Sequence, residues 1–138
     1  MIKLITGNKG SGKTKKLIDL TQEAVTNSKG NVVVIEKGSK LTYDISHEAR
    51  LIDIDNSNIL GPDALYGFIC GICEGNYDVT DILVDSTLKI CENDLDALIE
   101  LIKKIDSTSK KTNTNFVFSV STDSESVKNS LSDICEII

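Results

Sequence analysis

Eight residues near the start of the chain have the types and the spacing of a phosphate-binding loop. Residues 7–14 read Gly-Asn-Lys-Gly-Ser-Gly-Lys-Thr and match the pattern G-x-x-x-x-G-K-[ST] at every fixed position. Glycine can take positive φ and lets a ligand approach the backbone, so successive N–H groups can converge on phosphate oxygens. The pattern predicts that a polyphosphate is bound by Gly7, Asn8, Lys9, Gly10, Ser11, Gly12, Lys13 and Thr14.

Two side chains of this segment have expected roles of their own. Lys13 is expected to reach the β- and γ-phosphates, which makes it a candidate catalytic residue. The Thr14 hydroxyl is expected to ligate Mg²⁺. A helix that begins near Lys13 would add the partial positive charge and the unpaired amides of its N-terminus. The expected ligand is therefore ATP or another nucleoside triphosphate, bound with Mg²⁺.

This motif requires a strand before it and a helix after it, and the flanking sequence predicts both. Residues 1–5 form a short apolar run that suits a buried strand. Residues 13–28 place Leu17, Leu20, Thr21, Ala24 and Val25 on one face of a helix, and Gly30 is a plausible stop.

A second motif lies in residues 81–86, which read Asp-Ile-Leu-Val-Asp-Ser. An apolar strand that ends in an acidic residue is the form of the second nucleotide-binding motif, Walker B. Asp85 at such a strand end can hold Mg²⁺ through water beside the phosphate loop. The alternative is an ordinary turn residue, because many strands end in Asp.

The remaining elements alternate between strand and helix along the chain. Strands are predicted at 31–35, 49–53, 115–121 and 134–138, and helices at 61–74, 93–105 and 123–131. This order predicts an α/β three-layer domain with a mainly parallel sheet, formed by residues 1–138 as a single domain. Ligands of such sheets bind at the carboxyl ends of the strands, where residues 7–14, Glu36, Asp85, Ser119 and Ser121 would converge.

Four cysteines include a C-x-x-C pair at Cys70 and Cys73. Such a pair can bind zinc or exchange disulfides. Here it lies in an apolar segment with no second pair and no nearby histidine. The favoured interpretation is that these cysteines are small core residues.

Composition and net charge limit the kinds of binding partner that the sequence predicts. The net charge of −6 disfavours nucleic acid as the main ligand, because that affinity depends on Lys and Arg neutralising phosphates. The clustered basic residues lie around residues 7–14, where they offset nucleotide charge or are solvated: Lys9, Lys13, Lys15 and Lys16. No apolar run approaches the roughly 20 residues that cross a bilayer, and no signal peptide precedes the first strand. We expect a cytoplasmic protein with no membrane partner.

The two motifs and the order of elements resemble the P-loop NTPase superfamily over nearly the whole chain, and its RecA-like division in particular. Members of that division insert an extra strand between the phosphate-loop strand and the acidic strand, and residues 117–121 would occupy that position. Asp85-Ser86 is similar to the Asp-Ser of recombinase-type ATPases. The resemblance also nominates Ser119 or Ser121 as a γ-phosphate sensor and Glu36 as the catalytic glutamate that orients water. A solvated strand-end carboxylate is the alternative for Glu36.

Residues 3–40 also resemble the N-terminal half of thymidine kinases. Those enzymes follow the acidic strand with Asp-Glu and carry a zinc-binding lasso with paired cysteines. This chain has Asp85-Ser86 and ends soon after the next predicted strand. A nucleoside kinase of this sequence would therefore lack its usual base and its substrate lid.

The sequence offers little to accelerate hydrolysis. Arg50 is the only arginine, so a domain without an arginine finger is expected to turn over slowly unless a protein partner or a second copy completes the site. Arg50 itself could serve a neighbouring subunit or lie on the surface, and His47 has no nucleophile in view. Three functions stay open: a weak Mg²⁺-dependent ATPase or ATP switch, which is preferred, a nucleoside-kinase-like phosphotransferase, and a non-catalytic nucleotide-binding module of a larger assembly.

Overall fold

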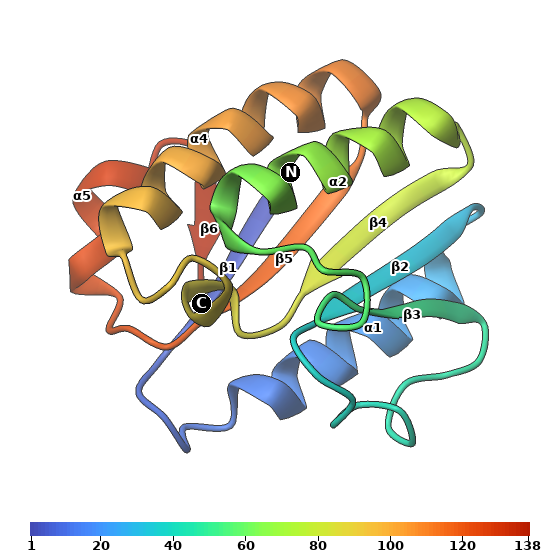
Figure 1. Ribbon diagram of the computed structural model, residues 1–138, viewed down its shortest axis with the longest axis horizontal. Coiled ribbons are helices and arrows are strands. Elements are labelled where there is room, and N and C mark those ends of the chain that lie inside the picture. The colour runs from blue at the N-terminus through green and yellow to red at the C-terminus, as the bar shows by residue number, and fades with distance from the viewer.

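A six-stranded parallel sheet forms the middle layer of the protein (Figure 1). The computed structural model describes residues 1–138, and the strands have the order β3-β2-β4-β5-β1-β6. Every neighbouring pair of strands is parallel, whereas the sequence predicted a mainly parallel sheet. The strands are β1 (Ile2–Thr6), β2 (Asn31–Glu36), β3 (Ala49–Asp53), β4 (Val79–Val84), β5 (Asn115–Val120) and β6 (Cys135–Ile137).

Helices cover the two faces of the sheet unequally. Three helices lie together on one face, namely α2 (Gly61–Gly75), α4 (Leu95–Thr112) and α5 (Glu125–Leu131). Helix α1 (Lys13–Asn27) lies on the other face, together with the segment that joins β2 to β3 (Figure 1). This is the predicted α/β three-layer arrangement. None of the helices combines the length and the apolar character that crossing a membrane requires.

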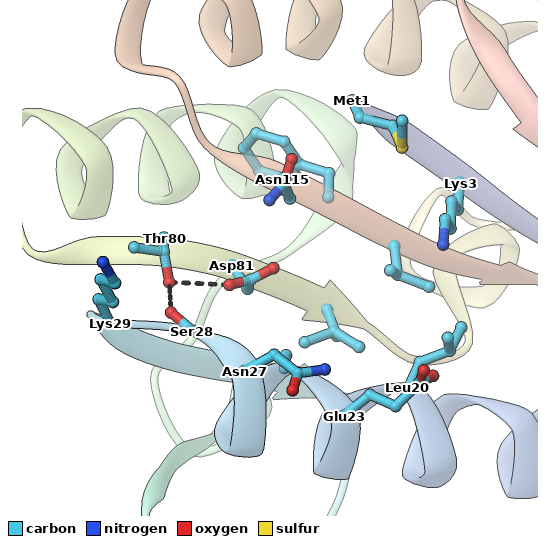
Figure 2. Close-up of a pocket in the computed structure, with 14 residues that line it drawn as sticks. Met1, Lys3, Leu20, Glu23, Asn27, Ser28, Lys29, Thr80, Asp81 and Asn115 are labelled. Atoms are coloured by element: carbon cyan, nitrogen blue, oxygen red, sulfur yellow. Dashed lines mark hydrogen bonds between the residues drawn. The ribbon is translucent and has the colours of Figure 1, made fainter.

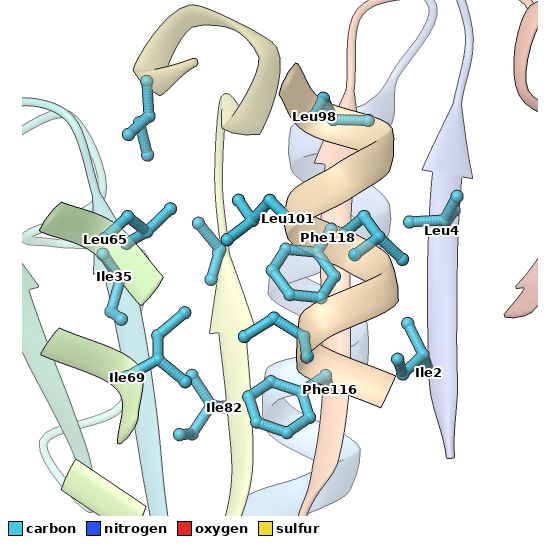
Figure 3. Close-up of a cluster of buried hydrophobic side chains, with 14 of the residues drawn as sticks. Ile2, Leu4, Ile35, Leu65, Ile69, Ile82, Leu98, Leu101, Phe116 and Phe118 are labelled. Carbon is cyan, nitrogen blue, oxygen red and sulfur yellow. The ribbon is translucent and has the colours of Figure 1, made fainter. Parts of the chain in front are cut away.

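Two hydrophobic clusters hold the layers together. The larger one contains 23 buried residues between the sheet and helices α2, α4 and α5. Figure 3 shows Leu65 and Ile69 of α2 beside Ile35 of β2 and Ile82 of β4, and Leu101 of α4 next to the Phe118 ring of β5. Eight buried residues form the smaller cluster beneath α1, which includes Leu17. Successive side chains of a strand point to opposite faces of the sheet, so alternate residues of β2 belong to different clusters.

The predicted position of the strand at 115–121 is confirmed. Strand β5 pairs with β1 on one side and with β4 on the other, so it separates the strand before residues 7–14 from the strand before Asp85. Neither neighbour could be identified from local sequence patterns, because strand order is set by packing across the whole sheet. The resemblance to RecA-like proteins supplied this expectation.

Helix α4 differs most from its prediction. The sequence predicted residues 93–105, whereas the helix spans Leu95–Thr112. Asp94 begins it by accepting a hydrogen bond from the Ala97 N–H. The polar run that follows the apolar stripe stays helical because its hydroxyls find partners, as when the buried Ser109 donates to the Thr114 carbonyl at 2.6 Å. A short helix, α3 (Thr87–Ile90), was not predicted.

The cysteines contribute mainly to the core, as predicted. Cys73, Cys91 and Cys135 are buried in the larger cluster, and Cys70 is half-buried with its Sγ 3.8 Å from the Thr108 hydroxyl. Burial raises the pKa of Cys91 to about 11 and that of Cys135 to about 12. These two thiols are therefore protonated and unreactive at neutral pH.

The aromatic rings of β5 yield a prediction about stability. The Phe118 side chain is fully buried, and its ring centroid lies 5.9 Å from that of Phe116. We expect Phe118→Ala to lower the free energy of unfolding by about 3–5 kcal/mol in urea, because it removes packing and leaves a cavity. Tyr77→Ala is the control, since Tyr77 is 94% exposed and should change stability by less than about 0.5 kcal/mol. Equal losses in the two variants would contradict this description of the core.

Candidate functional site

The loop formed by residues 7–12 joins β1 to α1 and has the predicted backbone. Gly7, Gly10 and Gly12 have φ values of 148°, 84° and 86°, which side chains rarely allow. At Gly7 an added Cβ would also overlap the Ser11 side chain. Glycine is therefore required at Gly7 by both conformation and space, and Gly12 leads directly into the first turn of α1.

Most N–H groups of this loop point to no acceptor within the protein. Gly7 donates to the Thr122 carbonyl at 2.8 Å, and Ser11 donates to the Asn8 carbonyl at 3.1 Å. The amides without such a partner belong to Asn8, Lys9, Gly10 and Gly12. Consecutive unpaired amides beside a helix N-terminus form a concave anion-binding feature.

The Lys13 ammonium lies over this loop. Its Nζ donates to the Asn8 carbonyl at 2.8 Å, and the side chain is half-buried. A phosphate oxygen carries more negative charge than a carbonyl, so an arriving polyphosphate competes well for the same ammonium. The adjacent Thr14 side chain is exposed and accessible to a ligand or to a cation.

Strand register aligns three predicted site residues at the carboxyl edge of the sheet. Ile35, Val84 and Phe118 occupy the same level of neighbouring strands, so the residues that follow them also form a row: Glu36, Asp85 and Ser119. The residues two positions before this row belong to the α1 side of the sheet: Val34, Leu83 and Val117. Because side chains alternate along a strand, the row faces the α1 side as well. The loop that follows β1 starts at the same edge.

Asp85 is held by two serines. The Ser119 hydroxyl donates to Oδ1 of Asp85 at 2.9 Å, and the Ser86 hydroxyl donates to Oδ2 at 3.2 Å. Each carboxylate oxygen keeps a lone pair that can face a cation or its bound water. Carboxylate and hydroxyl oxygens are the donors that Mg²⁺ prefers, so Asp85 and Thr14 fit this ion by chemistry.

Protein side chains alone do not form a metal centre here. No group of three or more His, Cys, Asp or Glu side chains has the arrangement to hold an ion. Mg²⁺ usually keeps several waters and takes one or two protein ligands together with substrate phosphates. The donor set therefore suits a cation that arrives with a nucleotide.

Glu36 is not the solvated carboxylate that the sequence left open as an alternative. Its side chain is 2% exposed, and its Oε1 accepts hydrogen bonds from the Lys40 N–H at 2.9 Å and the Leu41 N–H at 3.3 Å. Desolvation raises the pKa of Glu36, and the nearby Asp85 and Asp53 carboxylates raise it further, while the two backbone amides oppose the shift. Glu36 thus anchors the segment after β2 and lies close to Asp85.

Asp53 is a member of this row that the sequence analysis did not single out. It pairs with Glu36 across β2 and β3, and its Oδ1 accepts hydrogen bonds from the Gly38 and Asp55 amides. The signal was available, because Asp53 ends a predicted strand as Asp85 does. Its contribution depends on β3 pairing with β2, which the sequence pattern does not specify.

Other candidate residues lie away from this row or outside its contacts. Ser121 is exposed just beyond β5. Arg50 is exposed on β3, the edge strand separated from β1 by three other strands. His47 is exposed in the segment between β2 and β3. The structure therefore places no arginine beside residues 7–14 of the same chain.

A groove of about 530 Å³ lies between α1 and the sheet but at the opposite end of the strands (Figure 2). Its lining carries both charge signs, with Lys3 from β1, Asp81 from β4 and Glu23 from α1. The Thr80 hydroxyl bridges Asp81 and Ser28, which ties the end of α1 to the start of β4. Mixed charge and the absence of glycine-loop amides make this groove unsuitable for a polyphosphate.

The chain matches no protein-family model and no curated protein. What bears on function is therefore the chemistry at the carboxyl edge of the sheet, where parallel sheets bind their ligands. Unpaired amides and an ammonium lie there on one side, and the row of Glu36, Asp85 and Ser119 lies on the other.

The raised pKa of Glu36 predicts a pH dependence of stability. Its pKa in the folded protein lies above the ordinary value of 4.5, so its contribution to stability is fully present at pH values below 4.5 and is lost as the pH rises through the folded pKa. We expect the free energy of unfolding of Glu36→Gln, measured in urea, to rise relative to wild type between pH 4 and pH 7.

Glu48→Gln is the control for this experiment. Glu48 belongs to the same segment but is exposed, so its charge is solvated and its removal leaves the Glu36 environment intact. The prediction is contradicted if the free energy of unfolding of Glu36→Gln, relative to wild type, stays constant or falls between pH 4 and pH 7. Either result would show that burial of the Glu36 charge is not costly.

Proposed function

We propose that the protein binds a nucleoside triphosphate, most simply ATP, together with Mg²⁺ and hydrolyses it slowly. The observation that carries this proposal is the loop of residues 7–12, whose unpaired amides, helix N-terminus and Lys13 ammonium converge on one place. In this proposal the chain is a P-loop NTPase of the RecA-like division. The position of β5 between β1 and β4 supports that assignment.

The proposed metal contacts come from both sides of the site. The Thr14 hydroxyl would ligate Mg²⁺ directly, and Asp85 would hold it through water. When bound, the ion neutralises charge on the β- and γ-phosphate oxygens. Asp85 and Glu36 carry negative charges that would otherwise oppose binding of a polyanion, so ATP is expected to bind here only together with a cation.

Glu36 is the proposed residue that orients and deprotonates the attacking water. Its raised pKa favours acceptance of a proton, and it lies near Asp85. Its carboxylate is now engaged by the Lys40 and Leu41 amides, so the segment after β2 must shift to admit water. That requirement, with no arginine near residues 7–14, predicts slow turnover until a partner or a second copy supplies a cation.

A pocket beside Glu36 favours a second candidate function, phosphoryl transfer to a hydroxyl group. It has a volume of about 380 Å³ and lies between β2, β3 and the segment that joins them. Its lining includes the carboxylates of Glu36 and Asp53, the His47 imidazole, and no Lys or Arg; hydroxyls come from Ser39, Thr42 and Ser46. Such a lining suits an uncharged phosphoacceptor. A nucleotide-binding module without catalysis is the third candidate.

Nucleotide binding is tested by thermal unfolding with ATP, GTP, ADP and GDP, with and without Mg²⁺. At a ligand concentration of about 100 times Kd, binding adds about 2.7 kcal/mol, so we expect Tm to rise by several degrees. Lys13→Ala should weaken binding by about 10- to 150-fold, because a charge-assisted contact contributes about 1.5–3 kcal/mol.

Lys16→Ala is the matched control for Lys13→Ala. Lys16 lies on the same helix and carries the same charge, but it is exposed, and its side chain forms no hydrogen bond with the loop, whereas that of Lys13 does. Its loss should change affinity by less than about threefold. A wild-type protein whose Tm does not respond to any of these nucleotides would refute the proposed function.

Catalysis is tested by phosphate release at saturating Mg²⁺ and ATP. We expect Glu36→Gln to retain the nucleotide-induced rise in Tm and to release phosphate about 10²- to 10⁴-fold more slowly, because it removes a general base. Asp85→Asn should raise the Mg²⁺ concentration required. Binding without any phosphate release would identify the non-catalytic module, and ADP formation that depends on an added hydroxyl compound would identify the phosphotransferase.

A further inference from the structure

The Ser119 hydroxyl forms two hydrogen bonds with residues at the end of β4, one as donor and one as acceptor. It donates to Oδ1 of Asp85 at 2.9 Å and accepts a hydrogen bond from the Ser86 N–H at 2.9 Å. The side chain is 2% exposed. A buried hydroxyl placed between a carboxylate and the next backbone amide fixes the relative position of both.

Ser86 shows what this contact stabilises. Its φ of 56° lies in the left-handed region, which is strained for a residue with a side chain. Such strain persists only where surrounding contacts determine the backbone, and it concentrates at functional sites. Here the Ser86 amide is tied to Ser119, and the Ser86 hydroxyl donates to Oδ2 of Asp85 at 3.2 Å. The strained turn and the carboxylate orientation therefore depend on the same serine of β5.

We propose that Ser119 is the positioning residue of the metal site: its hydroxyl orients the Asp85 carboxylate so that its free lone pairs face the Mg²⁺-bound water. This inference rests on the proposed nucleotide function. Ser119 touches neither the nucleotide nor the ion and acts through Asp85. The resemblance to RecA-like proteins had nominated it for a direct γ-phosphate contact instead.

Hydrogen-bond capacity separates these two roles. A serine hydroxyl has one hydrogen to donate, and in Ser119 that hydrogen goes to Asp85. To donate to a phosphate oxygen, Ser119 would have to break its hydrogen bond to Asp85. Oδ1 of Asp85 would then lose one hydrogen-bond donor. Ser121 lies beyond the strand and is exposed, so its hydroxyl is accessible for a γ-phosphate contact without that cost.

The same segment of β5 also supports the phosphate loop. Two residues after β5 ends, the Thr122 carbonyl accepts the hydrogen bond from Gly7, the first residue of that loop. Residues 119–122 thus contact the metal side of the site through Ser119 and the phosphate side through Thr122. A side-chain substitution at Ser119 should therefore alter the position of Asp85 more than that of Gly7, because the contact between Gly7 and Thr122 uses backbone atoms only.

The test compares the Mg²⁺ concentration that gives half of the ATP-induced rise in Tm. Loss of a residue that orients a metal ligand typically costs 10- to 100-fold in metal affinity. We expect Ser119→Ala to raise the half-saturating Mg²⁺ concentration by at least about 10-fold, and to leave the smaller ATP-induced shift in EDTA unchanged. Ser119→Thr keeps the hydroxyl and should restore the wild-type Mg²⁺ dependence.

Two further variants keep the test decisive. Ser109→Ala is the control, because Ser109 is also a buried serine with a hydrogen bond, but it lies at the opposite end of the sheet. It should lower Tm without changing the Mg²⁺ dependence. Where Ser119→Ala does not fold, Ser119→Cys replaces it, since a thiol is nearly isosteric and a weak hydrogen-bond donor.

The outcomes distinguish this inference from the proposed function. A wild-type Mg²⁺ dependence in Ser119→Ala or Ser119→Cys, with nucleotide binding intact, would overturn the positioning role and leave nucleotide binding standing. An equal loss of the ATP-induced shift with Mg²⁺ and in EDTA would also overturn it, because that pattern indicates a direct phosphate contact. A wild-type protein that does not respond to ATP would refute both.

Discussion

The position of β5 between β1 and β4 is the constraint on which the rest of the site depends. Its hydrogen bonds to both neighbours fix the level at which the strands end, and that level places Glu36, Asp85 and Ser119 in one row. Strand β5 also supplies the Ser119 contact to Asp85, and the residues after it supply the Thr122 carbonyl that binds the Gly7 N–H. The core formed by Phe116 and Phe118 on its other face keeps β5 in place.

Electrostatics gives this arrangement its chemical character. Three carboxylates, those of Asp53, Glu36 and Asp85, lie on neighbouring strand ends; burial raises the pKa of Glu36, and the other two carboxylates raise it further. The unpaired amides of the neighbouring loop favour anions, whereas the carboxylates favour cations. The edge of the sheet therefore joins two regions that prefer ligands of opposite charge. In the proposed function a divalent cation satisfies both, because it binds carboxylates and phosphates at once.

Much of the fold was predictable from the sequence, and the reasons differ between elements. The β-branched run of β2 and the amphipathic stripe of α1 carry strong local signals, and their boundaries agree within one residue with those predicted. The last turns of α4 were not predicted because Ser109 and Thr108 in them form hydrogen bonds with groups distant in sequence, the Met1 amino group and the Tyr66 hydroxyl. At the site, the sequence motifs identified Lys13 and Asp85 as candidate residues. The burial of Glu36 and the two hydrogen bonds of the Ser119 hydroxyl arise from packing between strands, which no local pattern encodes.

The contact between Gly7 and Thr122 has a consequence for biosynthesis. Gly7 leaves the ribosome well before its acceptor, since 115 positions separate the two partners (122 − 7). Strand β5 inserts between β4, the strand that precedes it in the chain, and β1, which is translated more than 100 residues earlier, so the β1–β5 pair forms late and through contacts distant in sequence. A nascent chain therefore carries residues 7–12 without their contact to Thr122 until β5 has been translated and has joined the sheet.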